Sequence, residues 1–386
     1  MTDLAKLFKN SFGVDYELVY AAPARINLIG EHIDYNGGLV MPAAISRYTK
    51  ALVSKRKDKK IALKTTAYGG VAKKSVFHLS YDQKSGWANY AFGIFHDLLK
   101  DGYEINHGLN ILIDSNIPLG SGLSSSASLL NLIGFLANDI YGFGFSLKEI
   151  ALRSVKTENG YCGLKCGIMD EAAIALGEKD SALLLKCDNF DYELFKLNMG
   201  DYRFAVLQSN KKRKLTESKY NERVDECQKA LQLIQKEFSD VNNLCQLKSE
   251  HLPKVESLLN DLALFKRVRH CVKENERVFA FKEAMEKGDI ATAGGLLYES
   301  HLSLKEDYEV SGPHLDAIVE AAKLSGAIGA RMTGAGFGGC AIALIKKDGF
   351  PSFKENVSKL YEEKMGITPD IYLVDIVGGP RKVDNL

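Results

Sequence analysis

The stretch Pro118-Leu-Gly-Ser-Gly-Leu-Ser-Ser-Ser-Ala127 decides the fold, because it places a glycine-rich turn directly before an apolar-periodic helix. Gly120 and Gly122 permit backbone conformations that other residues resist, so successive N–H groups can point into one concavity. Ser124–Ser126 stand at the start of the helix, where unpaired N–H donors and a partial positive charge suit a phosphate. The segment is not a Walker loop, because the Lys-Ser/Thr pair of that motif is missing. The alternative to a phosphate site is a purely structural turn with a serine helix cap.

Periodic runs on both sides of this turn predict a mixed α+β protein. Short apolar or alternating runs predict strands at Leu18–Ala21, Ala51–Ser54, Ile61–Lys64, Leu109–Asp114, Arg203–Leu207, Gly339–Ile345 and Ile371–Val377. Apolar residues three and four apart predict helices over Trp87–Lys100, from the serine run to Gly142, and around Val224–Phe238. Strands dominate the part before the turn and helices the part beyond 150, which indicates two lobes with a boundary near 150–180.

The composition is that of a globular protein of two domains. The chain has 386 residues, 46% of them hydrophobic and 26% charged, and its 50 basic and 49 acidic residues give a formal net charge of +1. This balance provides no global field to attract nucleic acid, and no apolar run approaches the ~18 residues that indicate a membrane span. The first ten residues lack the apolar stretch of a signal peptide, and the seven cysteines are spread thinly. We therefore expect a cytoplasmic enzyme, a monomer without nucleic-acid or membrane partners.

A second glycine-rich segment, Arg331-Met-Thr-Gly-Ala-Gly-Phe-Gly-Gly-Cys340, formally contains the G-x-G-x-x-G pattern of dinucleotide-binding proteins. That pattern should open a helix, whereas the residues that follow Cys340 predict a strand. We therefore reject a dinucleotide site. The glycines still indicate a close backbone approach, either to a ligand or to a neighbouring strand in a structural hairpin.

A third segment, Ala21–Gly38, interrupts an apolar run with Arg25, Glu31, His32 and Asp34. Polar groups at such positions are buried unless they face a polar ligand. Acceptors and donors at short spacing suit a polyhydroxylated ligand such as a sugar. A metal site and an internal hydrogen-bond network are the alternatives.

These three segments, in this order, resemble the GHMP kinase superfamily and, within it, the galactokinase family. The galactokinase signature reads approximately GRVNLIGEHTDYN, and residues 24–36 read ARINLIGEHIDYN. The family's phosphate loop stands intact at Pro118–Ala127, its MTGAGFGGC motif at Met332–Cys340, and its CGIMDQ motif as Cys166-Gly-Ile-Met-Asp-Glu171. Shorter stretches extend the agreement over nearly the full length: Ser218–Arg223, His270–Asn275, Ser300–Leu304 and Val310–Asp316.

The resemblance implies a two-lobed α+β fold and a reaction. The first lobe, residues 1–150, is expected to resemble domain 2 of ribosomal protein S5 and to carry the sugar motif and the ATP phosphate loop. Residues 151–371 are expected to form a ferredoxin-like GHMP lobe, and 372–386 to return to the first lobe, with a strand near Tyr372–Val377. The implied activity is ATP-dependent phosphorylation of galactose at its anomeric hydroxyl, in a cleft between the lobes, with Mg²⁺ as cofactor.

The resemblance also assigns roles residue by residue. These are catalysis for Arg25 and Asp170; sugar contact for Glu31, His32, Ile33, Asp34, Gly167 and Tyr220; ATP phosphate binding for Gly120, Ser121, Gly122, Leu123, Ser124, Ser125 and Ser126; and Mg²⁺ binding for Ser126 and Glu158. Physical chemistry supports the first pair, because an arginine fork holds phosphates or carboxylates. A carboxylate at a helix start, between that positive pole and Arg25, should remain anionic and able to accept the sugar's proton. Helix capping by Asp170, a solvated Glu158 and a core Tyr220 are the structural alternatives.

Several residues depart from the galactokinase pattern: Ala24, Leu130 and Arg213, with Ile33 for threonine, Glu171 for glutamine and Lys186 for aspartate. Ile33 also occurs in N-acetylgalactosamine kinases of the same family, which makes that sugar an alternative substrate. The cations at 186 and 211–213 favour a second alternative, an acidic sugar such as galacturonate, unless they are solvated or bind ATP phosphates. A third is a sugar sensor without turnover, but the sensors of the family lack residues in the serine loop that is complete here.

Overall fold

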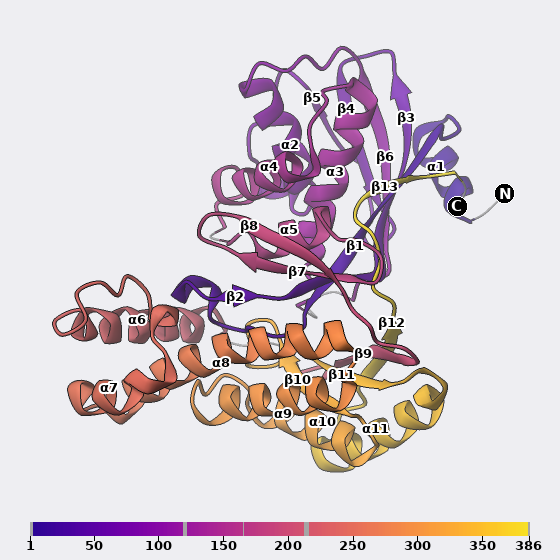
Figure 1. The fold of residues 1–386 in the computed structure, drawn as a ribbon. Coiled ribbons are helices and arrows are strands. Elements are labelled where there is room, and N and C mark those ends of the chain that lie inside the picture. The colour runs from indigo at the N-terminus through magenta and orange to yellow at the C-terminus, as the bar shows by residue number, and fades with distance from the viewer. Residues whose placement is uncertain (1–2, 119–121, 165, 212–215, 385–386) are drawn as a thin grey trace.

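A computed structural model describes residues 3–118, 122–164, 166–211 and 216–384, which form two lobes (Figure 1). The first lobe is built on a six-stranded sheet in the order β13-β1-β3-β6-β4-β5. All neighbouring pairs are antiparallel except β4 and β6. Its strands are β1 Leu18–Asn27, β3 Pro42–Arg56, β4 Lys60–Thr65, β5 Ala72–Ser75, β6 Gly108–Ser115 and β13 Arg381–Val383.

Helices cover both faces of this sheet, as the alternation of side chains along β1 requires. Tyr20 and Ala22 face a core that includes apolar residues of α2 and α3, whereas Val19 packs with Phe8 of α1 on the other face. The helices of this lobe are α1 Asp3–Phe12, α2 Ala88–Lys100, α3 Ser125–Tyr141, α4 Leu147–Gly160 and α5 Met169–Ala175, with the short 3-10 helix η2 Gln83–Ser85.

The second lobe contains a four-stranded antiparallel sheet in the order β10-β11-β9-β12. Phe204 and Val206 of β9 share a core with α6 and α8, while Ala205 and Leu207 share one with α10 and α11. Its strands are β9 Tyr202–Gln208, β10 Gly329–Thr333, β11 Cys340–Lys346 and β12 Asp370–Val374. Its helices are α6 Thr216–Ile234, α7 Leu252–Leu259, α8 Leu262–Lys287, α9 Ile290–Glu306, α10 Pro313–Leu324 and α11 Phe350–Met365, with η3 Leu244–Gln246, η4 Ser249–His251 and η5 Lys347–Gly349.

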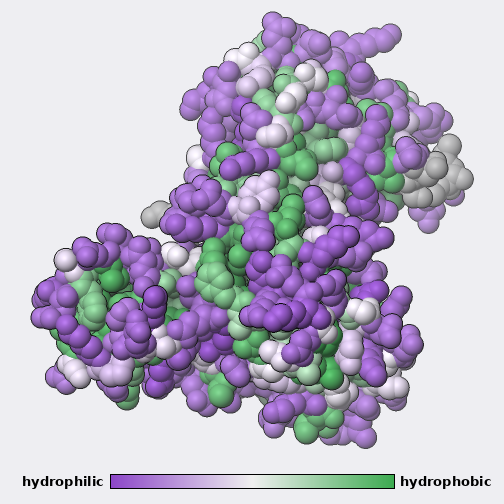
Figure 2. Space-filling model, viewed as in Figure 1, coloured by the Kyte–Doolittle hydropathy of each residue, from purple (hydrophilic) through white to green (hydrophobic). Residues whose placement is uncertain are grey.

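The two lobes share one hydrophobic core where β1 and β3 run down between them. Ile26 and Leu28 are fully buried in the same cluster as Val268 of α8 and Ile342 of β11. Figure 2 shows hydrophilic residues over most of this face of the molecule, with hydrophobic ones gathered near the junction of the lobes. Among the described helices, none combines the length and the apolar character needed to cross a bilayer. The residues after Ile26 on β1 therefore lie at the interface of the lobes.

The structure contains every predicted strand and helix but corrects the predicted boundary between the lobes. A small sheet of β2 Leu39–Val40, β7 Ser181–Lys186 and β8 Asp191–Lys196 packs its apolar residues against α4 and α5. Because α4 and α5 in turn pack on α3, this whole segment belongs with the first lobe. We therefore place the boundary after β8 rather than near 150. The sequence could not show this, because an apolar helix face does not reveal its partner.

The predicted return of the chain to the first lobe begins later than expected. Residues 370–374 form β12 and pair with β9 of the second lobe, so the assignment of Tyr372 to the return strand is wrong. The return begins at Asp375, whose backbone exchanges hydrogen bonds with Ser46 of β3. It is completed by β13, which pairs with residues 19–21 of β1.

Candidate active site

A cavity of about 180 Å³ lies where the two lobes meet, and seven of the sixteen predicted site residues line it. Those of the first lobe come from β1, from the loop after it and from the start of α5; those of the second lobe come from α6 and from the loop after β10. Among the described residues, the lining consists of Arg25, Asn27, Gly30, Glu31, His32, Asp34, Cys166, Gly167, Met169, Asp170, Tyr220, Gly334 and Ala335. Seven of these were predicted: Arg25, Glu31, His32, Asp34, Gly167, Asp170 and Tyr220.

Arg25 joins the predicted catalytic aspartate to the phosphate loop. Its Nε and Nη2 each donate to one carboxylate oxygen of Asp170 at 2.7 Å, and its Nη1 donates to the carbonyl of Gly122 at 2.7 Å. The hydroxyl of Ser124 donates to the same carboxylate. Burial works against the charge of Arg25, but Asp170 outweighs it and holds the pKa of the guanidinium above its ordinary value. One cation therefore organises both halves of the predicted site.

Local backbone features orient the side chains of Arg25 and Asp170 toward the site. The pairing of β1 with β3 shifts register between Pro23 and Ala24, a bulge that re-aims the residues after it. Asp170 lies in the first turn of α5, and it uses its side chain for Arg25 and Ser124 rather than as a helix cap. The capping alternative for Asp170 is therefore not the one that the structure shows.

The described part of the phosphate loop has positive φ angles at a glycine, where the sequence predicted such freedom, and at a serine, where it did not. Gly122 has a φ of 81°, and Ser124 takes the left-handed conformation, at 59°, which is rare outside glycine. The helix α3 begins at Ser125, so Ser125 and Ser126 stand in its first turn, where backbone N–H groups lack partners within the helix. The side chain of Leu123 is buried. Gly120 and Ser121 lie outside the described residues.

Glu31 is held by protein groups alone. Its carboxylate accepts hydrogen bonds from Asn27 at 3.0 Å, from Arg331 at 2.6 Å and from the backbone N–H of Gly334 at 2.7 Å. Both Glu31 and Arg331 are buried, so this ion pair ties the loop after β1 of the first lobe to β10 of the second. The internal network considered for this segment is therefore present at Glu31, which forms a wall of the cavity.

The imidazole of His32 and the carboxylate of Asp34 line the cavity, where they can form hydrogen bonds with a ligand. Burial lowers the pKa of His32 to about 3, so its ring is neutral at physiological pH, and its Nδ1 lies 2.9 Å from the hydroxyl of Tyr35. Burial is also the main cause that raises the pKa of Asp34 to about 6, with the charges of Glu31 and Asp170 adding to it. A neutral imidazole and a carboxylate that titrates near pH 6 suit hydroxyl groups.

The side chain of Ile33, a predicted sugar contact, does not line the cavity with His32 and Asp34. Its side chain is fully buried in the shared hydrophobic core, and Ile33 is not among the residues that line the cavity. Gly38 packs so closely that an added Cβ would lie 2.7 Å from the Cδ1 of Ile33. The prediction of a sugar contact is thus wrong for this side chain, because the residue between two polar neighbours points the other way.

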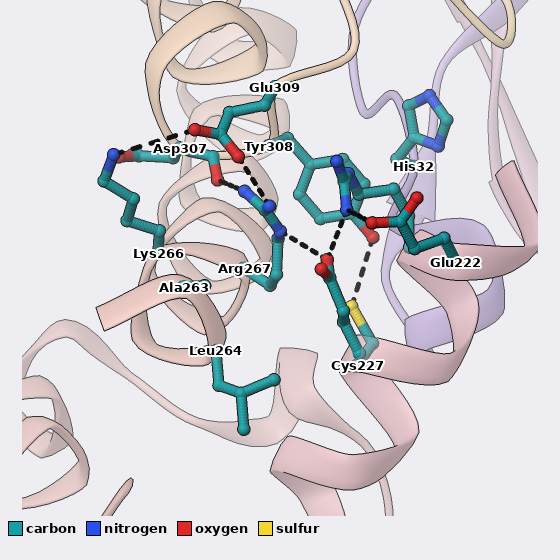
Figure 3. Close-up of polar contacts among 12 residues, drawn as sticks. His32, Glu222, Cys227, Ala263, Leu264, Lys266, Arg267, Asp307, Tyr308 and Glu309 are labelled. Atoms are coloured by element: carbon teal, nitrogen blue, oxygen red, sulfur yellow. Dashed lines mark hydrogen bonds and ion pairs between the residues drawn. The ribbon is translucent and has the colours of Figure 1, made fainter. Parts of the chain in front are cut away.

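The helix that carries Tyr220 is fixed by an ionic network around a buried arginine (Figure 3). Arg267 of α8, 2% exposed, donates to Glu226 of α6 at 2.6 Å and to Glu309 at 2.6 Å, and it also contacts the carbonyl of Asp307. At the next residue of α6, Sγ of Cys227 lies 3.1 Å from the hydroxyl of Tyr308. This anchoring sets where Tyr220 stands, with its ring 5.6 Å from that of His32.

Glu158 is buried, which excludes the alternative of a solvated surface residue. It lies on the last turn of α4, and its carboxylate, that of Glu171 and Sγ of Cys166 come within 4.8 Å of one another. Burial first, and the neighbouring carboxylates after it, raise the pKa of Glu171 well above its ordinary value. No arginine or lysine of the described residues pairs with either glutamate, so the two carboxylates fit a divalent cation such as Mg²⁺. Ser126 stands at the start of α3, against which α4 packs.

Several residues in and around this site were not predicted, and Arg331, Asn27 and Cys166 are the three with side-chain chemistry of note. Arg331 was quoted within a motif but given no role, although an arginine inside the apolar run Gly329–Thr333 signals a buried ion pair. Asn27 and Cys166 carried no comparable signal, because an isolated amide or thiol shows its partners only after folding.

Family models of known proteins match each of the two lobes. The model of the GHMP kinase N-terminal domain matches residues 89–178, and that of the GHMP kinase C-terminal domain matches 281–363. Solved mevalonate kinases share the fold at 21% identity, with TM-scores of 0.68 and 0.70. Fold and site therefore define a GHMP kinase.

More specific similarities narrow the class. The galactokinase galactose-binding signature matches residues 6–55. The galactokinase of Enterococcus faecalis is 44% identical over 98% of this chain and 99% of its own length, and that of Clostridium acetobutylicum is 41% identical over 99% and 98%. The crystal structure of Lactococcus lactis galactokinase complexed with galactose aligns with a TM-score of 0.91 at 41% identity, covering 98% of this chain and 99% of that one. The chain belongs to the galactokinase family.

Proposed function

We propose that this protein transfers the γ-phosphate of ATP to the anomeric hydroxyl of D-galactose, giving galactose 1-phosphate and ADP. The observation that carries the proposal is the convergence on Arg25, whose guanidinium binds Asp170 with one edge and the phosphate loop with its third nitrogen. Such a cation lies where the two reactants must meet. Phosphoryl transfer depends mainly on positioning and on neutralising charge, and both are tasks for a fixed arginine.

Asp170 serves the sugar hydroxyl in this mechanism. The oxygen at C1 attacks the γ-phosphorus, the bond between that phosphorus and the bridging oxygen of ADP breaks, and the hydroxyl proton passes to the carboxylate. Asp170 is partly exposed to the cavity and held by both Arg25 and Ser124. It is thereby oriented to accept that proton or to direct the hydroxyl. Arg25 neutralises the charge that builds on the transferred group.

The sugar side of the cavity supports a neutral hexose. Asp34, His32, Tyr220 and Gly167 are the proposed contacts, while Glu31 holds the wall behind them. A galacturonate would need a free cation, yet no lysine lies among the described lining residues. Lys186 is half-buried and pairs with Asp188 at 3.4 Å, Lys211 is exposed, and positions 212 and 213 lie outside the described residues. Galactose therefore remains the proposed substrate.

ATP is proposed to bind its phosphates at the loop from Gly120 to Ser126 and at the start of α3. Unpaired N–H groups and the positive end of that helix favour the phosphates. Glu158 and Ser126 would hold Mg²⁺, which supplies positive charge against the phosphate oxygens when bound. That the protein works as a cytoplasmic monomer is a further prediction, to be checked by cell fractionation and by light scattering.

A substrate panel tests the proposal. ATP consumption is measured with galactose, N-acetylgalactosamine, galacturonate, glucose and arabinose, and the product is checked by NMR for phosphate at C1. We expect galactose to give the highest kcat/KM. Exclusive turnover of galacturonate would replace the substrate, and sugar binding without any ADP release would replace the kinase with a sensor.

A further inference from the structure

Beside the cavity, at the junction of α4 and α5, three side chains bring metal-binding atoms together. They are Glu158, Cys166 and Glu171, with ligand atoms all within 4.8 Å of one another. Glu171 is fully buried, and neither of its carboxylate oxygens has a hydrogen-bond partner among the described residues. A buried carboxylate needs donors, a proton or a cation, so this group is incomplete as it stands.

The thiol of this group is both fixed and reachable. Asn159, next to Glu158, accepts from the backbone N–H of Cys166 at 2.8 Å and donates to its carbonyl at 3.2 Å. Cys166 is half-buried and lines the cavity. The cavity therefore provides an entry path for an ion, and the backbone that carries the sulfur is already positioned against α4.

We propose that Glu158, Cys166 and Glu171 form a binding site for Zn²⁺, and that zinc bound there withdraws Glu158 from its role toward Mg²⁺. Zinc is the cation that combines carboxylate and thiolate ligands, whereas Mg²⁺ and Ca²⁺ select oxygen alone. With bonds of about 2.0–2.3 Å, a tetrahedral zinc needs its ligand atoms about 3.3–3.8 Å apart. Because the ligand atoms already lie within 4.8 Å of one another, small shifts of the side chains reach this spacing, and a water would complete the site.

Zinc binding also resolves the electrostatic cost of the empty group. Burial and the closeness of three acidic side chains disfavour negative charge on this group in the absence of a cation. A divalent cation reverses this preference: it displaces the thiol proton and any proton shared between the carboxyl groups, and these protons go to solvent. The binding itself needs only this chain. The competition with Mg²⁺ rests on the proposed function.

Metal binding is tested on the full chain after removal of metals by a chelator and dialysis. The protein is titrated with ZnCl₂ against a chromogenic zinc chelator, using wild type, Cys166→Ser, Glu171→Gln and, as matched control, Cys162→Ser, a half-buried cysteine outside the group. We expect one zinc per chain, affinity lower by about tenfold or more in the first two variants, and no change in the control. Circular dichroism verifies folding.

Cobalt identifies the sulfur. With CoCl₂ we expect a near-ultraviolet thiolate-to-cobalt charge-transfer band in wild type and in Cys162→Ser, and no band in Cys166→Ser. The proposal is overturned if wild type does not bind zinc, if both ligand variants bind it with wild-type affinity, or if the cobalt band survives Cys166→Ser. Should Cys166→Ser not fold, the zinc affinity of Glu171→Gln decides the outcome alone.

The competition is tested separately, by ATP turnover at limiting Mg²⁺ with and without added zinc. Each variant is compared with its own zinc-free rate. We expect zinc to inhibit wild type and Cys162→Ser, and to inhibit Glu171→Gln only at about tenfold higher concentration. Equal inhibition of all three refutes the competition. Absence of turnover would overturn the proposed function and leave the zinc titration, which needs no activity, unaffected.

Discussion

Two buried glutamates, one in the wall of the cavity and one beside it, have opposite surroundings. Glu31, on the sugar side, accepts from Asn27, Arg331 and the N–H of Gly334. Glu171, on the cation side, is buried as deeply and has no hydrogen-bond partner among the described residues. Buried polar groups are normally paired. The protein itself therefore satisfies the carboxylate of Glu31, whereas the carboxylate of Glu171 needs a bound ligand to be satisfied.

The two glutamates therefore have different roles, although they are the same residue type. A glutamate with a full set of donors stabilises the join between lobes, and its loss is a loss of structure. A glutamate without donors lowers stability in the empty protein and becomes favourable only with a bound cation. The comparison can be broken by experiment at five points.

The largest effect is expected at Asp170, which lies between the two sides. Asp170→Ala removes the proposed proton acceptor and the partner of Arg25, so we expect kcat to fall by about a thousandfold or more. Galactose binding, measured by calorimetry, should remain detectable because the sugar wall is intact. Turnover near the wild-type value would refute the assigned role.

The same substitution at the two glutamates should give opposite results. Glu31→Gln leaves Arg331 buried without its charged partner, and we expect the free energy of unfolding to fall by about 3–5 kcal/mol. Glu171→Gln removes an unpaired buried carboxylate and should leave that free energy unchanged or raise it by about 1 kcal/mol. Denaturant titration of both variants without metal measures the difference. If both lose the same stability, the contrast is wrong.

Removing the carboxylate of Glu158 should change the magnesium requirement more than it changes the stability of the protein. With Glu158→Ala we expect the Mg²⁺ concentration for half-maximal rate to rise about tenfold to a hundredfold. A magnesium titration at saturating ATP and galactose checks this. An unchanged magnesium requirement would move the metal ligand elsewhere.

Acidity should affect the sugar side through Asp34. Its pKa is near 6, so the carboxylate loses its charge below that pH and becomes a weaker acceptor for sugar hydroxyls. We expect the KM for galactose to rise about tenfold for each pH unit below 6. Asp34→Asn should bind galactose weakly at every pH and show no such slope. His32 cannot produce the slope, because its pKa lies near 3.

The smallest effect is expected at Tyr308, whose hydroxyl lies 2.9 Å from that of Tyr35 and 3.1 Å from Sγ of Cys227. Tyr308→Phe removes about 1 kcal/mol of hydrogen bonding behind His32, so KM for galactose should rise about fivefold with kcat retained. Tyr298→Phe, which loses a bond to the carbonyl of Ala327 away from the cavity, is the matched control. Equal KM values in the two variants would show that Tyr308 does not position the sugar wall.

The sequence predicted the elements and the motifs of this site better than their partners. The position of α3, with its serine-lined start, followed from local chemistry, because a glycine turn before an apolar period has few other solutions. The assignments of α4 to a lobe and of residues 370–374 to a sheet needed tertiary packing, which periodicity does not contain. Glu171 was noted only as a departure from a motif. Its unpaired state depends on how α4 and α5 pack together.

The position of β13 affects the order in which the protein can mature. Residues 381–383 complete the edge of the sheet beside β1, yet they are made after the entire second lobe. On the ribosome, the nascent first lobe must therefore wait with the edge of β1 uncovered until residues 381–383 have been made. Chaperones have their clearest opportunity to bind during that interval, and a bulky fusion placed close behind residue 383 would prolong it.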